Sequence, residues 1–138
     1  MRVIRFEELQ KLYSQPTDTL YIVNFWATWC RPCVAELPNF ERAHRYYQNK
    51  KVKIVLVSMD FAKDLKSKVQ PFITKKQLKN PVVLLNEMDG NQFIDQVDTS
   101  WTGAIPATLL VNTRRQKRKF FEKELTYDQL VQEINGLL

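Results

Sequence analysis

Two cysteines separated by two residues are the feature of this sequence best suited to chemistry. Cys30 and Cys33 are the only cysteines in the chain, and they lie between the apolar run 20–23 and a stretch with helical spacing. A sulfur at a strand-to-helix junction meets the unpaired N–H groups and the positive end of the helix dipole, which favour a thiolate. The second sulfur can then attack a mixed disulfide formed on the first. The spacing predicts reversible thiol–disulfide exchange, with Cys30 and Cys33 as the catalytic pair.

Other uses of such a pair fit the sequence less well. A structural zinc or iron–sulfur site usually takes four protein ligands, whereas this chain offers two cysteines and one histidine, His44. A second subunit could complete such a site, but nothing in the sequence indicates one. A purely structural disulfide would stabilise little, because closing so short a loop removes little chain entropy. We therefore expect no metal site, and no nucleotide or flavin cofactor, because the dithiol itself carries the electrons.

Length and composition predict a single domain over residues 1–138. A chain of 138 residues buries roughly two-thirds of its unfolded surface. Its 44% hydrophobic and 12% aromatic residues are sufficient for a core. No apolar run approaches the length of a membrane span, and the first residues lack the apolar region of a secretory signal. We interpret Met1 as the start either of a cytoplasmic protein or of a chain from which a signal was trimmed.

The net charge of +6 arises from basic residues spread over several segments, 42–53, 63–79 and 114–119. A protein that reads nucleic acid concentrates such residues on one face, with groove-reading or aromatic partners. The densest segment, 114–119, lies between two apparent strands and is typical of a charged hairpin turn. We therefore expect no nucleic-acid binding, whereas a basic surface favours acidic protein partners.

Strands and helices alternate along the chain. The predicted strands are 20–27, 53–58, 82–85, 107–111 and 119–123, the last two as a hairpin. The predicted helices are 6–13, one that follows Cys30, one over about 65–73, and a final one that Thr126 caps with Gln129 in a capping box. Residues 86–100 are a polar stretch to which we assign no element. This order implies a mixed sheet with helices on both faces.

Two segments resemble the signatures of thioredoxin-fold proteins. Residues 24–33 read Asn-Phe-Trp-Ala-Thr-Trp-Cys-Arg-Pro-Cys, and they are most similar to the TlpA/ResA branch of bacterial thiol–disulfide oxidoreductases. Residues 103–110 resemble the second landmark of the fold, a cis-proline loop followed by a strand. The interval between the two resembles that branch in leaving room for an extra helix–strand insertion, about 64–85. The resemblance implies an α/β thioredoxin-like fold with a central mixed sheet flanked by helices and with this insertion.

Asn24 marks a departure from thioredoxin itself, which has a buried aspartate there that moves protons for the second cysteine. Asn24 cannot titrate, and we interpret it as a residue that satisfies buried hydrogen bonds. The TlpA/ResA branch resembles this chain in having a carboxylate three residues after the second cysteine, here Glu36. Positions i and i+3 of a helix share a face, so the Glu36 carboxylate could accept a proton from Cys33. The alternative is an ordinary solvated helix glutamate.

Five further residues are implied to meet the substrate. Trp29, Arg31 and Pro32 surround the cysteines, and Ile105 and Pro106 form the cis-proline loop. Trp29 is expected to shape an apolar docking surface, and Arg31 to favour the thiolate of the first cysteine. The backbone of Ile105 would pair with an extended substrate strand, as in strand addition at a sheet edge.

Four other residues invite a functional interpretation. We expect Trp26 to be a packing residue, His44 to lie on the outer part of a helix without a catalytic role, and Asp60 to be a helix cap. Trp101 is either a packing residue or part of a substrate groove.

The resemblance implies a protein-disulfide reductase. It further implies a disulfide-containing protein as substrate, a thiol donor that recharges the dithiol, and an extracytoplasmic, periplasmic location. In that branch the donor is typically a membrane protein that carries electrons out of the cytoplasm. Two other classes stay open. One is a thioredoxin-fold binding or chaperone module with an inert disulfide, and the other is a thiol peroxidase, which needs a peroxidatic cysteine in its own sequence context.

Overall fold

Six strands and five α-helices make up the fold in a computed structural model that describes residues 1–87 and 90–138. The strands are β1 (Arg2–Ile4), β2 (Leu20–Trp26), β3 (Val52–Ser58), β4 (Val82–Leu85), β5 (Ala107–Asn112) and β6 (Lys117–Phe121). The helices are α1 (Phe6–Tyr13), α2 (Arg31–Tyr46), α3 (Gln70–Lys76), α4 (Gly90–Val97) and α5 (Tyr127–Leu137). A 3₁₀ turn, η1 (Ala62–Asp64), and a π-helical segment, η2 (Leu65–Val69), lead into α3.

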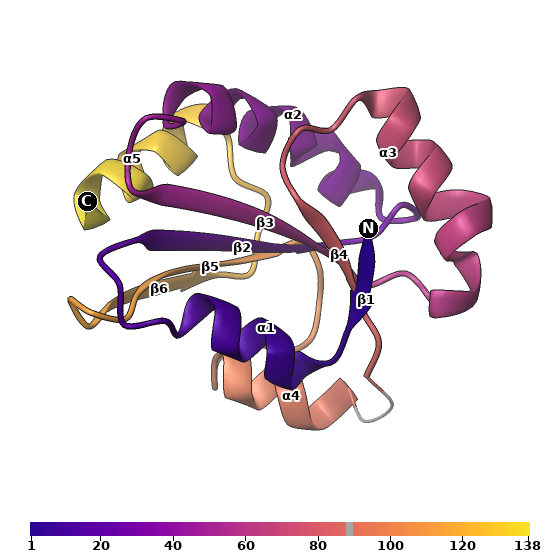
Figure 1. The fold of residues 1–138 in the computed structure, drawn as a ribbon, viewed down its shortest axis with the longest axis horizontal. Helices are drawn as coiled ribbons and strands as arrows, with labels where there is room; N and C mark the ends of the chain where they lie inside the picture. The colour runs from indigo at the N-terminus through magenta and orange to yellow at the C-terminus, as the bar shows by residue number, and fades with distance from the viewer. Residues whose placement is uncertain (88–89) are drawn as a thin grey trace.

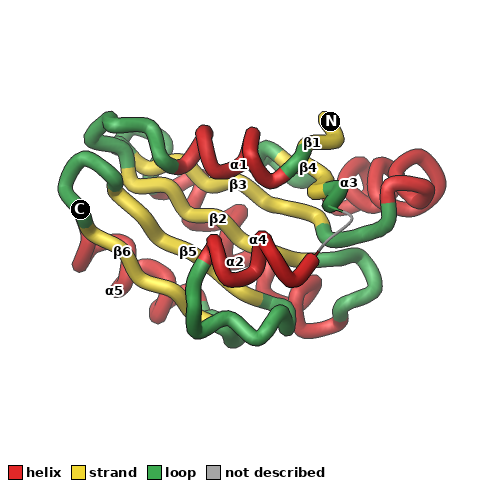
Figure 2. The backbone as a smooth tube through the Cα atoms, turned by 90° about the horizontal axis from the view of Figure 1, so that it is seen from below, coloured by secondary structure: helices red, strands yellow, loops and turns green. Residues whose placement is uncertain are grey.

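The strands form one mixed sheet in the order β1-β4-β3-β2-β5-β6. β2 runs parallel to β3 and antiparallel to β5, so the sheet changes direction at its centre. Helices α2, α3 and α5 lie on one face of the sheet and α1 and α4 on the other (Figures 1 and 2). The predicted mixed sheet with helices on both faces is confirmed. Among the described residues, no helix combines the length and the apolar character that crossing a membrane requires.

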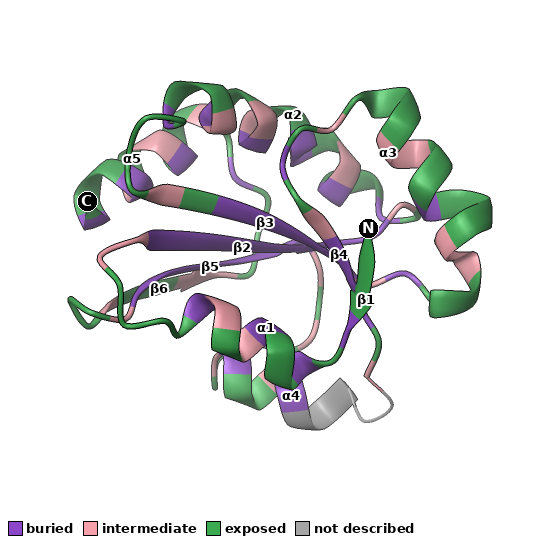
Figure 3. Ribbon diagram, viewed as in Figure 1, coloured by how far each residue is buried: buried purple, intermediate pink, exposed green. Residues whose placement is uncertain are grey.

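Successive side chains of β2 enter two different cores, because neighbouring residues of a strand point to opposite faces. On one side, Leu20, Ile22 and Trp26 pack with Cys33, Leu37 and Phe40 of α2 and with Leu130 and Ile134 of α5, a set we call the α2-side core. On the other, Tyr21, Val23 and Phe25 pack with Phe6 and Leu9 of α1 and with Phe93 and Val97 of α4, the α1-side core. The central strands are buried along most of their length, whereas the edge strand β1 is largely exposed (Figure 3).

Several aromatic rings contact one another in the α1-side core. The Trp101 ring has its centroid 4.7 Å from that of Phe25, 5.7 Å from that of Phe120 and 6.0 Å from that of Phe93. The ring of Phe93 in turn lies 5.8 Å from that of Phe6. Trp101 is therefore a packing residue that joins the sheet to α4.

Two elements were not predicted from the sequence. β1 has only three residues, of which Ile4 alone is buried, so no alternating pattern is available to reveal it. α4 occupies part of the stretch 86–100, where its apolar contacts come from Phe93, Val97 and the partly buried Ile94. The predicted capping box of α5 is confirmed, since the Thr126 side chain accepts from the Gln129 N–H and the Gln129 side chain accepts from the Thr126 N–H.

Candidate active site

Cys30 and Cys33 form a disulfide at the start of α2, with their Cα atoms 5.3 Å apart. Cys30 is the N-cap residue, and its carbonyl accepts the N–H of Val34 at 3.0 Å. Cys33 lies in the first turn and is completely buried, whereas 6% of Cys30 is exposed. The more accessible sulfur is thus the one at the end of the helix dipole, where a thiolate is favoured.

The loop before β5 lies against the Cys30 sulfur. The Ile105–Pro106 bond is cis, as predicted, and the Ile105 carbonyl oxygen lies 3.8 Å from Cys30 Sγ. The antiparallel register of β2 and β5 pairs Phe25 with Ala107, which brings the end of one strand beside the start of the other. The register therefore places the two sequence signatures at the same end of the two central strands, β2 and β5.

Glu36 lies inside the α2-side core and has no exposed surface. Its Oε1 accepts a hydrogen bond from the Asn24 side-chain amide at 2.9 Å, and its Oε2 accepts one from the Leu125 N–H at 2.8 Å. Burial raises the pKa of Glu36 to about 7, and these two hydrogen bonds offset only part of that effect. The alternative of a solvated helix glutamate is wrong, because the contacts of Glu36 come from β2 and from the segment before α5.

Asn24 has the expected hydrogen-bonding role on the same face of the sheet. Besides Glu36, its amide donates to the Thr108 hydroxyl at 3.1 Å. Glu36 and Cys33 are three residues apart and both belong to the buried face of α2. The structure thus brings a carboxylate of raised pKa, a buried cysteine and a non-titrating amide into one helix–sheet interface.

A family model described as the AhpC/TSA family matches residues 7–118. The chain belongs to this family. It is 31% identical over 116 residues to the thiol-disulfide oxidoreductase ResA of Oceanobacillus iheyensis, which covers 84% of this chain and 56% of that protein. The chain therefore spans little more than half the length of this relative.

Solved structures of other proteins have the same architecture. StoA from Bacillus subtilis is 26% identical and superposes with a TM-score of 0.62, covering 84% of this chain and 82% of that one. A thioredoxin-related protein from Neisseria meningitidis serogroup B is 20% identical, with a TM-score of 0.76 and coverages of 88% and 86%, and supports the fold alone. The thioredoxin-like fold and the resemblance to ResA-type proteins are confirmed.

Asp60 has a different role in this AhpC/TSA-family chain from the helix cap expected from the sequence. The residue at the N-cap of η1 is Phe61, and no side chain caps that turn. The buried Asp60 carboxylate instead accepts the Thr28 hydroxyl at 2.6 Å, the Thr28 N–H at 3.1 Å and the Ser58 hydroxyl at 2.6 Å. It ties the segment before Cys30 to the end of β3. The sequence signal was its place directly after a strand parallel to β2, at the edge where the cysteines lie.

The expected substrate-facing residues differ in exposure. Arg31 and Pro32 are exposed, Ile105 is half-buried and Pro106 is buried. Trp29 is 67% exposed, as a docking residue requires. Phe61, which sequence analysis did not select, is 69% exposed and follows the carboxylate that holds Thr28.

The remaining candidates are structural. Trp26 is fully buried, with its ring centroid 5.5 Å from that of Phe72, so it is a packing residue as predicted. The buried Trp101 donates its indole N–H to the Ala104 carbonyl at 2.8 Å and so fixes the loop before Ile105 to the core. His44 lies in the last turn of α2, at the opposite end of the helix from the cysteines.

Proposed function

We propose that this chain is a thiol–disulfide oxidoreductase that reduces disulfide bonds in proteins through Cys30 and Cys33. The observation that carries the proposal is the position of the pair: Cys30, the less deeply buried cysteine, lies at the N-terminus of α2 beside the Ile105 carbonyl, and the completely buried Cys33 follows it in the first turn. Similarity to ResA and StoA supports the same activity.

The reaction proceeds in two exchange steps. The Cys30 thiolate attacks one sulfur of the substrate disulfide, the substrate S–S bond breaks, and the departing substrate thiolate takes up a proton. The Cys33 thiolate then attacks the Cys30 sulfur, which releases the second substrate thiol and leaves the Cys30–Cys33 disulfide. Two electrons pass to the substrate, and the pair of thiols is oxidised.

Glu36 accepts the proton that Cys33 must lose before the second step. Burial disfavours the Cys33 thiolate, so an acceptor on the same face of α2 accelerates its formation. A carboxylate with a pKa of about 7 suits this role, since it exists in both protonation states near neutral pH. Asn24 and the Leu125 N–H hold the carboxylate oxygens in place.

The substrate docks as an extended strand along the loop before β5. The Ile105 carbonyl, 3.8 Å from the Cys30 sulfur, is positioned to pair with the backbone of a segment whose disulfide reaches that sulfur. Pro106 maintains the shape of the loop. Trp29 and Pro32 offer apolar surface beside the sulfur, and Arg31 adds a positive charge.

A separate protein that donates electrons from thiols must reduce the Cys30–Cys33 disulfide after each cycle. From the resemblance to the TlpA/ResA branch we propose a membrane electron-transfer protein as this donor and an extracytoplasmic, periplasmic location for the chain. Reduction by an isolated membrane fraction, compared with reduction by a cytoplasmic thioredoxin system, tests the donor.

Reduction of insulin and consumption of hydrogen peroxide, measured side by side, test the activity. We expect insulin reduction and no peroxide consumption. Cys33→Ser should accumulate a mixed disulfide with insulin, because attack occurs without resolution, and Cys30→Ser should form none. Peroxide consumption would instead indicate a peroxidase, and failure in both assays a binding module. The reduction potential of the pair then gives the direction of electron flow, since a strongly reducing value supports a reductase.

A further inference from the structure

A groove of about 440 Å³ runs between α2 and the α3 region, beginning one residue after Cys33. Apolar side chains of Val34, Leu37, Phe72 and Leu78 line it. The core holds Phe72 in place, because its ring packs against that of the fully buried Trp26. The groove is therefore a formed surface that continues from the redox pair along the flank of α2.

The rim of this groove is positively charged. Arg45, Lys76 and Lys79 line it, and the Lys76 ammonium lies 5.9 Å from the centroid of the Phe72 ring. In the described ranges 1–87 and 90–138, none of the ion pairs involves these three cations. Their charge is thus available to an incoming anion, and Lys76 offers it directly over an apolar floor.

In the part of the chain that the structure describes, Glu41 supplies the one carboxylate on the rim, and it is already hydrogen-bonded within the fold. Glu41 accepts hydrogen bonds from the Lys79 N–H and from the side-chain amide of Asn80, the latter at 2.6 Å. These bonds hold the carboxylate against the start of the segment that leads into β4. Glu41 therefore shapes the groove wall and leaves the rim with a net positive charge.

We propose that this groove docks an acidic amphipathic segment of a partner protein. The segment places a large apolar side chain on Phe72 and Leu78 and its carboxylates on Arg45, Lys76 and Lys79. Grooves of this kind accept one face of a helix through apolar anchors, and complementary charge sets orientation and association rate. A protein is the expected occupant because the groove adjoins the helix end at which a partner's disulfide would meet Cys30. In naming a redox partner, the inference rests on the proposed function.

Binding to the oxidised protein tests the groove independently of catalysis. A short helical peptide with Leu and Glu at i, i+3 and i+4 spacing is titrated into ¹⁵N-labelled protein, and amide shifts are followed by NMR. We expect the largest shifts at Val34, Phe72 and Leu78. Lys76→Glu should weaken binding about tenfold, because a negative side chain then faces the carboxylates of the peptide where a positive one had attracted them.

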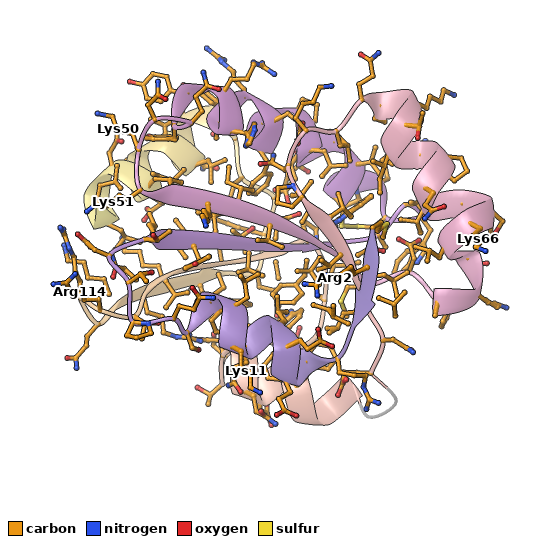
Figure 4. All side chains as sticks on the ribbon, in the orientation of Figure 1. Arg2, Lys11, Lys50, Lys51, Lys66 and Arg114 are labelled. Carbon is orange, nitrogen blue, oxygen red and sulfur yellow. A yellow bond between two sulfur atoms is a disulfide. The ribbon has the colours of Figure 1, made fainter. Side chains whose placement is uncertain are left out.

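A matched control is Lys11→Glu, which changes the net charge equally on α1, on the opposite face of the sheet from α2 and α3 (Figure 4). It should change the affinity by less than about twofold. A second peptide, with Ser in place of Leu, should bind more weakly, because it lacks the apolar anchor. Equal losses in both lysine variants, or shifts confined to residues outside the groove, would overturn the proposal.

Further measurements distinguish docking of a protein segment from binding of a small carboxylate, and docking from the redox activity. If sodium laurate shifts the same amides while the peptide does not bind, the groove takes small amphipathic carboxylates and the partner-segment proposal fails. The control variant outside the groove should reduce a small aromatic disulfide at the wild-type rate, which shows that a change in net charge alone leaves the redox chemistry intact. Peptide binding in a protein that fails to reduce insulin would leave the groove assignment intact and refute the proposed activity alone.

Discussion

The two cores on either side of β2 differ in whether their buried titratable group changes charge near neutral pH. In the α1-side core, burial raises the pKa of Tyr13 from its ordinary value of 10.0 to about 12, still further from the physiological range. In the α2-side core, burial raises the pKa of Glu36 to about 7, where the side chain changes charge under ordinary conditions. One strand thus supplies alternate residues to an inert scaffold and to a face that responds to protons. The chemistry of the molecule is concentrated on a single face of the sheet.

The largest expected effect lies on the scaffold face and should leave the thiols unchanged. Phe93→Ala removes a ring that contacts those of Phe6 and Trp101 and should lower the free energy of unfolding by about 3–5 kcal/mol. Urea denaturation measures the loss, and equilibration with glutathione measures the reduction potential of the folded variant. A potential that moves together with the stability would show that the two faces are not separable.

The second effect should be confined to the face under α2. The folded-state pKa of Glu36 lies above its ordinary value of 4.5, so the folded protein binds more protons between about pH 4.5 and 7. Stability of the oxidised form should therefore fall as pH rises through this window, by about 3 kcal/mol at most, and level off above it. Glu36→Gln should abolish this slope in urea denaturation, whereas Glu7→Gln on the surface of α1 should preserve it. An unchanged slope in Glu36→Gln would contradict the assignment.

The same substitution has a kinetic consequence. Glu36→Gln cannot take a proton from Cys33, so the second exchange step should slow while the first attack by Cys30 stays nearly intact. Stopped-flow reduction of a model disulfide across pH should show a transient mixed disulfide. Wild-type resolution rates with an unaltered pH profile would leave Glu36 with a structural role only.

Local sequence patterns predicted what depends on neighbouring residues. The alternation along β2, the cysteine spacing and the capping box at Thr126 all act over a few positions, and each is present in the structure. The environment of Glu36 depends on Leu125, and that of Asp60 on Thr28, across distant parts of the chain. These contacts exclude the solvated alternative for Glu36 and give Asp60 the role of joining two loops in place of capping a helix, and no local pattern encodes them.

A smaller effect, on the kcat/KM for insulin, is expected from exposed aromatic side chains near the cysteine end of α2. Trp29, Phe61 and Tyr46 are 67%, 69% and 66% exposed. Trp29 directly precedes Cys30, and Phe61 follows Asp60, which is hydrogen-bonded to Thr28, whereas Tyr46 ends α2. Trp29→Ala and Phe61→Ala should each lower kcat/KM for insulin about fivefold, because each removes about 1 kcal/mol of docking contact. Tyr46→Ala is the matched control and should have no effect. Equal losses in all three variants would indicate a general loss of solubility or structure.

The smallest effect is expected at Arg31, which is exposed beside the redox pair. Its positive charge favours the Cys30 thiolate and hence the reduced form, so Arg31→Gly should make the potential more reducing. An exposed charge pair contributes about 0.5 kcal/mol, which corresponds to about 10 mV for a two-electron couple. Glutathione equilibria at low and high salt measure it, and the difference should vanish at high salt. A shift that persists at high salt would contradict a purely electrostatic origin.

The antiparallel pairing of β2 with β5 makes the active site modular. Cys30 and Ile105 are 75 positions apart, yet hydrogen-bonded strand register, rather than the chain between them, determines their proximity. Loops within the intervening segment can therefore lengthen or acquire new helices without moving the sulfur from the carbonyl beside it, provided that α2, β3 and the contacts of Asp60 with Thr28 are kept. A protein built this way can diversify its choice of partner while its redox centre remains constant, and a designer could graft new recognition surfaces into the same interval.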